Sequence, residues 1–169
     1  LGSLITSKTR LRMLIKFFVS AANNGYLNGL ANEFNESTNS IRKELNNLSS
    51  AGYLLKSKEN NRIVYNANTS HPMFEVLQKI VRQHLGLEDI VETVINRIGD
   101  VDQIALTGEY AKGIDSGNIE IVINGLKVNN EYLENIKPKI KRKIGREVSF
   151  LVNQKLDSNS IILYKKTTK

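Results

Sequence analysis

The sequence predicts an α+β protein of two units, the second of which holds a small mixed sheet. Apolar residues recur at helical spacing through residues 7–51, whereas the second half contains four short apolar runs typical of strands. A turn-rich stretch at 66–72, which ends in a proline, is the one boundary signal. We therefore expect a first domain at 1–70, an amphipathic connecting helix at 71–86 and a second domain at 87–169.

Charge divides the chain in a similar way. Residues 1–70 carry 9 Lys/Arg and 4 Asp/Glu, residues 71–136 carry 5 and 11, and residues 137–169 carry 10 and 2. The formal net charge of +7 favours a polyanionic partner. The absence of Cys excludes disulfides, thiolate zinc sites and cysteine nucleophiles. No apolar run is long enough to span a membrane and residues 1–7 lack signal-peptide features, so we expect a cytoplasmic protein without membrane contact.

Three helices are predicted in the first domain, at about 7–22, 29–34 and 38–51. The expected N-cap is Thr6 or Ser7 for the first helix and Ser37 or Glu36 for the third. The first helix is expected to bury one stripe with three- and four-residue spacing, at Leu11, Leu14, Ile15, Phe18 and Val19.

The third helix has one apolar face, at Ile41, Leu45 and Leu48, and a polar outer face without a carboxylate, because Glu44 falls near the buried edge. A helix that enters the major groove of DNA needs side chains that donate to base edges and phosphates. A merely solvated surface would explain this face equally well. The candidate DNA-binding residues on it are Ser37, Thr38, Asn39, Ser40, Arg42, Lys43 and Asn46.

A basic hairpin follows the third helix and favours the DNA-binding interpretation. Strands are expected at 53–58 and 62–66, joined by a tight turn at 59–61. Cations around an Asn-rich tip suit the phosphate backbone or the adjacent minor groove. The candidate contact residues on the hairpin are Lys56, Lys58, Asn60, Asn61 and Arg62.

The order of these elements, and the run from Leu30-Ala-Asn-Glu-Phe through Ser37-Thr-Asn-Ser-Ile-Arg-Lys-Glu-Leu to Ala51-Gly-Tyr-Leu, resembles the winged helix-turn-helix regulators of the MarR/ArsR type. The resemblance covers about the first 68 residues. It implies a sequence-specific regulator of transcription that binds double-stranded DNA, usually as a homodimer on a palindromic site.

The remainder is predicted as a connecting helix followed by an α/β arrangement. The connecting helix, at 73–85, should bury Met73, Leu77, Ile80, Val81 and His84, with His84 a structural residue rather than a metal ligand. The next helix, at 87–98, should bury Ile90, Val91, Val94, Ile95 and Ile98. A last helix is expected at 131–144, and strands at 101–106, 119–123, 148–152 and 161–164.

The segment Leu106-Thr-Gly-Glu-Tyr-Ala-Lys-Gly-Ile-Asp-Ser-Gly-Asn-Ile-Glu-Ile-Val-Ile123 resembles the signature of minimal nucleotidyltransferases. In active members, two carboxylates one residue apart on a strand hold two Mg²⁺ ions, and a Gly-Ser turn holds the triphosphate. The matching positions form a vestigial nucleotide site: Gly108, Glu109, Lys112, Asn118 and Glu120.

This chain departs from that signature at the positions that bind metal ions and the triphosphate in active members. Asn118 replaces the first carboxylate, and Glu109 replaces the serine that should face the triphosphate. Glu147 is the nearest candidate for a third carboxylate, but strand alternation alone leaves its direction open. These changes should cost several kcal/mol of transition-state stabilisation. We therefore expect no catalytic residue, no metal site and no cofactor.

The basic run Lys137-Pro-Lys-Ile-Lys-Arg-Lys-Ile-Gly-Arg146 is explained either as a solvated helix face or as a further contact for phosphate, for an anionic ligand or for the acidic middle of a partner subunit. The leading hypothesis is a DNA-binding regulator whose second domain serves sensing, dimerisation or partner binding, with a small anionic or nucleotide effector. The alternatives are an active nucleotidyltransferase with a DNA-targeting head and an antitoxin-like interaction module.

Overall fold

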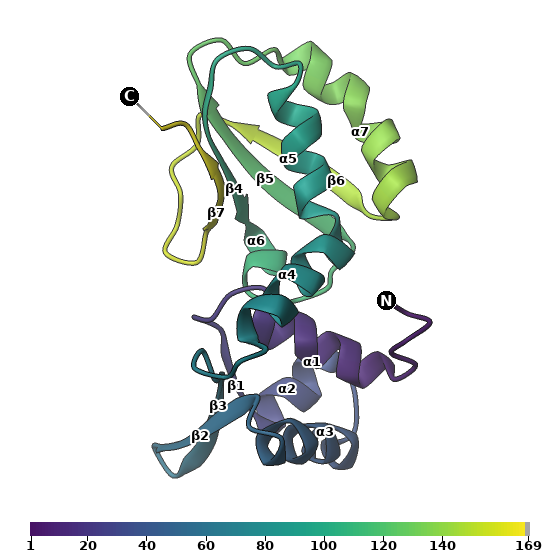
Figure 1. Cartoon of the computed structure of the whole chain (residues 1–169), viewed down its shortest axis with the longest axis vertical. Coiled ribbons are helices and arrows are strands. Elements are labelled where there is room, and N and C mark those ends of the chain that lie inside the picture. Colours follow the sequence, from purple (N-terminus) through teal and green to yellow (C-terminus); the bar gives the residue numbers. More distant parts are fainter. Residues whose placement is uncertain (168–169) are drawn as a thin grey trace. The chain divides into compact units, whose positions relative to one another are not determined.

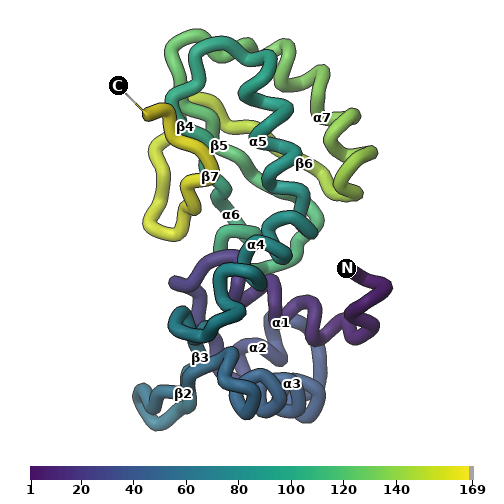
Figure 2. The backbone as a smooth tube through the Cα atoms, in the orientation of Figure 1, coloured from purple at the N-terminus to yellow at the C-terminus, as the bar shows by residue number. Residues whose placement is uncertain are grey.

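The computed structural model describes residues 1–167, and it confirms the α+β class. The chain forms two compact units, Leu1–Val81 and Arg82–Lys169, and it passes from one to the other within helix α4 (Figures 1 and 2). No helix in the described part of the chain is long and apolar enough to cross a membrane.

Unit 1 combines helices with a small antiparallel sheet whose strand order is β1-β3-β2. Ser7 and Ser37 cap the first and third helices, each accepting a hydrogen bond from the backbone N–H three residues later, at 3.2 Å. The elements are α1 (Lys8–Phe18), β1 (Asn24–Tyr26), α2 (Leu27–Phe34), α3 (Thr38–Ser50), β2 (Leu54–Glu59), β3 (Arg62–Ala67) and the first turns of α4 (Phe74–Leu85).

Unit 1 differs from the expected elements at the end of the first helix and in one additional strand. The first helix ends at Phe18 rather than near Ala22, because residues 20–23 turn back and the Asn23 side chain donates to the Lys16 carbonyl at 3.0 Å. The structure also contains a short strand before α2 that the sequence analysis did not predict, β1, which pairs with β3. Its three residues, Asn-Gly-Tyr, are too few to show an alternating pattern.

The core of unit 1 is wider than a single stripe. Met13 and Phe17 are fully buried beside the expected residues of α1, so this helix packs on more than one side. In α4, Phe74 is buried against Phe18, with ring centroids 5.8 Å apart, whereas Met73 is 43% exposed and Ile80 36% exposed. The expected burial of Met73 and Ile80 is therefore wrong, because the aromatic contact rotates the buried face of the helix to Phe74 and Val81.

Unit 2 is a four-stranded mixed sheet in the order β6-β5-β4-β7, in which β5 and β6 are parallel and the other pairs antiparallel. The predicted strands and helices are all present, and α5 packs on β7 while α7 packs on β6. Ile95 ends α5 and is 37% exposed, so its expected burial is wrong. The elements are α5 (Leu87–Ile95), β4 (Val101–Thr107), α6 (Gly108–Ala111), β5 (Asn118–Gly125), α7 (Asn130–Ile144), β6 (Glu147–Val152) and β7 (Ile161–Lys165).

Candidate nucleic-acid interface

The outer face of α3 is solvent-exposed along its whole length. Ile41, Leu45 and Leu48 are buried beneath it, which leaves the polar residues outside. Arg42 donates to the side chain of Asn39 at 3.3 Å, so this cation is partly oriented before any ligand arrives. The residues predicted on this face are all exposed: Ser37, Thr38, Asn39, Ser40, Arg42, Lys43 and Asn46.

The hairpin of β2 and β3 ends in a turn of two residues, Asn60 and Asn61. Both residues have positive φ, 46° and 62°. A two-residue turn with positive φ at both positions matches the right-handed twist of the strands that it joins. Glu59 therefore pairs with Arg62 across the strands instead of belonging to the turn. The predicted contact residues of the hairpin are all exposed: Lys56, Lys58, Asn60, Asn61 and Arg62.

Three of the four carboxylates in the first 70 residues are held by α1. Arg10 Nε lies 2.9 Å from Glu44, Arg12 Nη1 3.0 Å from Glu36, and Lys16 Nζ 2.9 Å from Glu33. These ion pairs also connect α1 to α3, to the turn before α3 and to α2. The ion pairs thus neutralise the negative charge on the side of the helices that faces α1.

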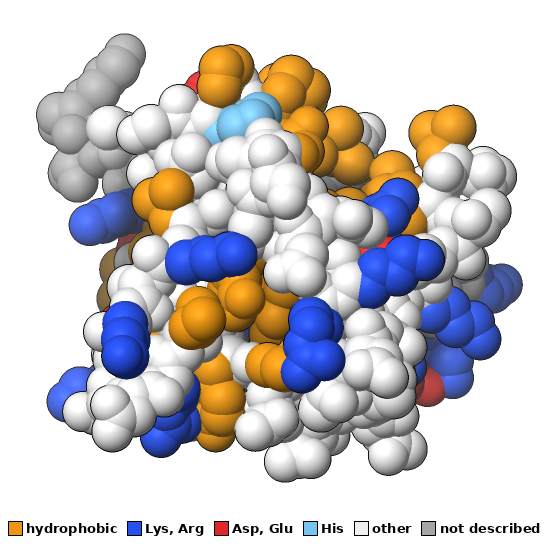
Figure 3. Space-filling view, turned by 90° about the horizontal axis from the view of Figure 1, so that it is seen from below, with side chains coloured by type: hydrophobic (Ala, Val, Ile, Leu, Met, Phe, Trp, Pro, Cys, Tyr) orange, Lys and Arg blue, Asp and Glu red, His pale blue; other side chains and the backbone are white. Residues whose placement is uncertain are grey.

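Five of the remaining cations of unit 1 lie on α3 and the hairpin. Arg42, Lys43, Lys56, Lys58 and Arg62 are exposed, and within residues 1–167 none of them forms an ion pair. Glu59, the fourth carboxylate, accepts a hydrogen bond from the Ser57 hydroxyl at 3.2 Å. Figure 3, which looks at this end of unit 1, shows several separate blue Lys and Arg side chains across a mostly white face and very little red. The folded unit therefore separates charge far more sharply than its net charge of +5 suggests.

A hollow of ≈ 360 Å³ lies between α3 and the hairpin. Figure 3 shows apolar side chains at the bottom of a depression among the cations. Sequence reasoning found the cations but missed the hollow, because its walls come from five elements, β1, α2, α3, β2 and β3. The lining residues are Tyr26, Leu27, Asn28, Arg42, Leu45, Asn46, Lys56, Arg62, Ile63 and Tyr65.

In unit 2 the strand register resolves the direction of Glu147. In the parallel pair, Asn118 lies beside Glu147 and Glu120 beside Ser149, so these four side chains share one face of the sheet. The Ser149 hydroxyl donates to the Asn118 side-chain oxygen at 3.0 Å, and Glu147 pairs with Lys141. The oxygen of Asn118 and the carboxylate of Glu147 are thus engaged within the chain.

Glu120 lies directly against the Gly108 turn. A Cβ added to Gly108 would be 2.7 Å from the carboxyl carbon of Glu120, so the carboxylate fills the space directly beside this turn. Glu109 and Lys112 are exposed near this turn. Among the described residues, no group of three His, Asp or Glu side chains could hold a metal ion. Two carboxylates beside the turn would repel a triphosphate.

A buried polar network next to this motif was not predicted. Tyr110 is fully buried, and its hydroxyl donates to Asp115 while it accepts from Gly117 N at 3.0 Å and Arg146 Nε at 3.1 Å. Burial and the bond to Asp115 raise the pKa of Tyr110 to about 12. Burial would raise the pKa of Asp115, but hydrogen bonds from Tyr110 and Arg146 lower it. Burial and the Arg146 charge lower the pKa of His84.

Tyr110→Phe is expected to remove a pH dependence of stability above pH 10. The pKa of Tyr110 is raised from 10.0 to about 12 in the folded chain, so the unfolded chain loses this proton first. Stability is fully present below pH 10 and falls by roughly 1 kcal/mol per pH unit as the pH rises through this window. Urea unfolding of both proteins at several pH values between about 8 and 12 measures the difference. Parallel pH profiles would show that Tyr110 does not titrate in this way.

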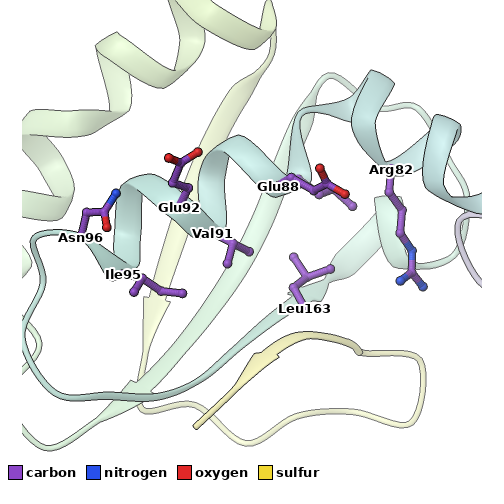
Figure 4. A pocket seen from close by; sticks show the side chains of 8 residues that line it. Arg82, Glu88, Val91, Glu92, Ile95, Asn96 and Leu163 are labelled. Carbon is purple, nitrogen blue, oxygen red and sulfur yellow. The ribbon is translucent and has the colours of Figure 1, made fainter.

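A further groove in unit 2, with a volume of ≈ 510 Å³, lies between α5 and β7 (Figure 4). Val91 and Ile95 lie on the side of α5 nearer to Leu163, whereas Glu92 projects from the opposite side of the helix. The lining also includes Glu88 and Arg82. With two carboxylates against one cation, this groove is poorly suited to a nucleotide.

Comparison with known proteins gives no further guidance, because no family profile, no curated protein and no solved structure matches the chain.

Proposed function

We propose that unit 1 is a winged helix-turn-helix that binds double-stranded DNA and that the chain regulates transcription. The observation that carries this proposal is the separation of charge: α1 holds three carboxylates, while five cations without ion pairs among residues 1–167 lie on α3 and the hairpin. A duplex presents a regular array of phosphates to such a surface.

The shape of the surface supports different roles for α3 and for the hairpin. The major groove of B-DNA admits one α-helix, so α3 enters it with Asn39, Arg42, Lys43 and Asn46 toward the base edges. Arg and Lys pair with guanine and Asn with adenine, so this face can discriminate sequences. The hairpin then lies along the phosphate backbone. Two copies of the chain on inverted half-sites would double the contact area, which favours a homodimer.

We propose that unit 2 is a nucleotidyltransferase-like domain without catalytic activity. The register of β5 and β6 supports this, because Asn118 contributes no charge and Glu120 lies against the turn that would carry phosphate. A two-metal mechanism needs carboxylates to offset the charge of both ions. The unit then serves sensing, dimerisation or partner binding. An active nucleotidyltransferase and an antitoxin-like module remain the alternatives to test.

In vitro selection of random duplex DNA by the full chain tests the proposal. We expect enrichment of an inverted repeat whose half-sites are one helical turn apart, about 10 base pairs from centre to centre. The affinity should fall steeply with salt, because bound phosphates release counterions. The selection is run with and without a panel of Mg²⁺–nucleotides, and incorporation of a nucleotide into DNA or protein would favour the enzyme instead. Failure to enrich any sequence would refute the proposal for unit 1.

A further inference from the structure

One cation of the interface, Arg62, is stacked on an aromatic ring. Its guanidinium carbon lies 4.4 Å from the centre of the Tyr26 ring. Tyr26 is 37% exposed, so Arg62 reaches solvent while its orientation is restricted. A guanidinium held on an aromatic face loses less conformational freedom when it binds a ligand than a free side chain does.

Gly29 makes this arrangement possible. A Cβ at Gly29 would lie 2.8 Å from the Tyr26 Cζ, so any larger residue at the start of α2 would push the ring away. Tyr26 is the last residue of β1 and directly precedes α2, which connects the position of its ring to both elements. The chain therefore positions Arg62 through Tyr26 and Gly29.

A second cation is held in a similar way on the same hairpin. Lys56 Nζ lies 5.8 Å from the centre of the Tyr65 ring, which is its cross-strand partner and is buried. Arg42, oriented by Asn39, comes from α3. Arg42, Lys56 and Arg62 all line the hollow between α3 and the hairpin, so cations from three elements, α3, β2 and β3, converge on one small space.

The floor of this hollow is apolar. Leu27, Leu45 and Ile63 line it together with the two tyrosine rings, and Ile63 is 51% exposed. An apolar floor below a cationic rim matches a sugar–phosphate unit, since the deoxyribose presents C–H groups and the phosphate a negative charge. A free inorganic anion would leave the floor without a partner.

We infer that this hollow holds one sugar–phosphate unit of the duplex backbone, and that Tyr26 and Gly29 are positioning residues for Arg62. The inference rests on the proposed function of unit 1 and specifies how the protein is placed along the duplex. Contacts to phosphate fix the register of a protein on DNA without reading sequence. Arg62 thus sets where α3 meets the base edges, which Asn39 and Lys43 face from outside the hollow.

A methylphosphonate scan of the selected duplex tests the inference. Each phosphate in turn is replaced by a neutral methylphosphonate, and affinity is measured for the wild-type chain and for Arg62→Ala. We expect one position in each half-site at which the wild type loses about tenfold in affinity, as for a charged hydrogen bond. At that same position the Arg62→Ala variant should lose less than about twofold, because the partner of the phosphate is already gone.

Tyr26 supplies the matched pair of variants. Tyr26→Phe keeps the ring and should retain the wild-type loss at that phosphate, whereas Tyr26→Leu and Gly29→Ala should reduce it. For each variant, the affinity for the methylphosphonate duplex is divided by the affinity of the same variant for the unmodified duplex. A general change in stability therefore does not alter this ratio. The slope of log affinity against log salt should fall by about one for Arg62→Ala, should also fall for Tyr26→Leu and Gly29→Ala, and should stay unchanged for Tyr26→Phe. If the duplex is bound but no phosphate shows this coupling, the inference is wrong and the proposed function stands. If no duplex is bound, both are wrong.

Discussion

Arg42→Ala combined with Lys43→Ala is expected to lower the affinity of the chain for its selected duplex by at least about thirtyfold. Each base or phosphate contact of this kind contributes about 1–3 kcal/mol, and two of them are lost together. Both side chains are exposed on α3, outside the ion pairs with α1, so their removal should leave the fold unchanged. Fluorescence anisotropy with a labelled duplex, and with the same duplex mutated in one half-site, measures affinity and specificity.

The charge-matched control lies on the other unit. Lys139→Ala with Arg142→Ala removes the same two charges from α7, where both side chains are exposed and form no ion pair within residues 1–167. We expect this variant to lose less than about threefold, through the weakened long-range field alone. Equal losses in the two variants would mean that general charge, and not the α3 face, carries the binding.

The arrangement of elements could largely be predicted because hydrophobic spacing reports it directly. The stripe of α3 shows the helical period, whereas the segments of β4 to β7 are recognised as short apolar runs of strand length. β1 could not be predicted in this way, since Asn24–Tyr26 becomes a strand only through its partner β3. The exposure of Met73 depends likewise on a tertiary contact, that between Phe18 and Phe74.

The candidate interface likewise contains residues that could be predicted from the sequence and contacts that could not. Arg42, Lys43 and the hairpin cations could be predicted, because each stands at an outward position of a regular element. The ion pair of Arg10 with Glu44 joins residues 34 apart in sequence, and the bond of Arg146 to Tyr110 joins residues 36 apart. Such contacts leave no periodic signal. The stacking of Arg62 on Tyr26 also depends on how β1 pairs with β3, so no local sequence pattern predicts the hollow.

Arg10→Met is expected to destabilise unit 1 by about 2 kcal/mol, between the values for exposed and fully buried ion pairs. The side chain of Glu44 is only 7% exposed, whereas that of Arg10 is 45% exposed. Removing Arg10 therefore leaves a carboxylate under α3 that has lost its cation and is poorly solvated. Amide hydrogen exchange of α1 and α3 measures the effect within unit 1. Lys8→Met on the same helix is the control, since Lys8 is exposed, and should cost less than about 0.5 kcal/mol.

The double variant decides whether the pair acts as a unit. Arg10→Met combined with Glu44→Leu removes both charges, so we expect it to recover most of the stability that Arg10→Met loses. It should also retain DNA affinity, because Glu44 is buried and its charge is already compensated in the wild-type chain. Arg10→Met alone should bind DNA more weakly than the double variant, since an uncompensated carboxylate then lies beneath α3 and opposes the phosphates. The idea is wrong if the two substitutions have additive effects on stability and if Arg10→Met and the double variant bind DNA equally well. The ion pair between Arg10 and Glu44 would then play no part in making the α3 face positive.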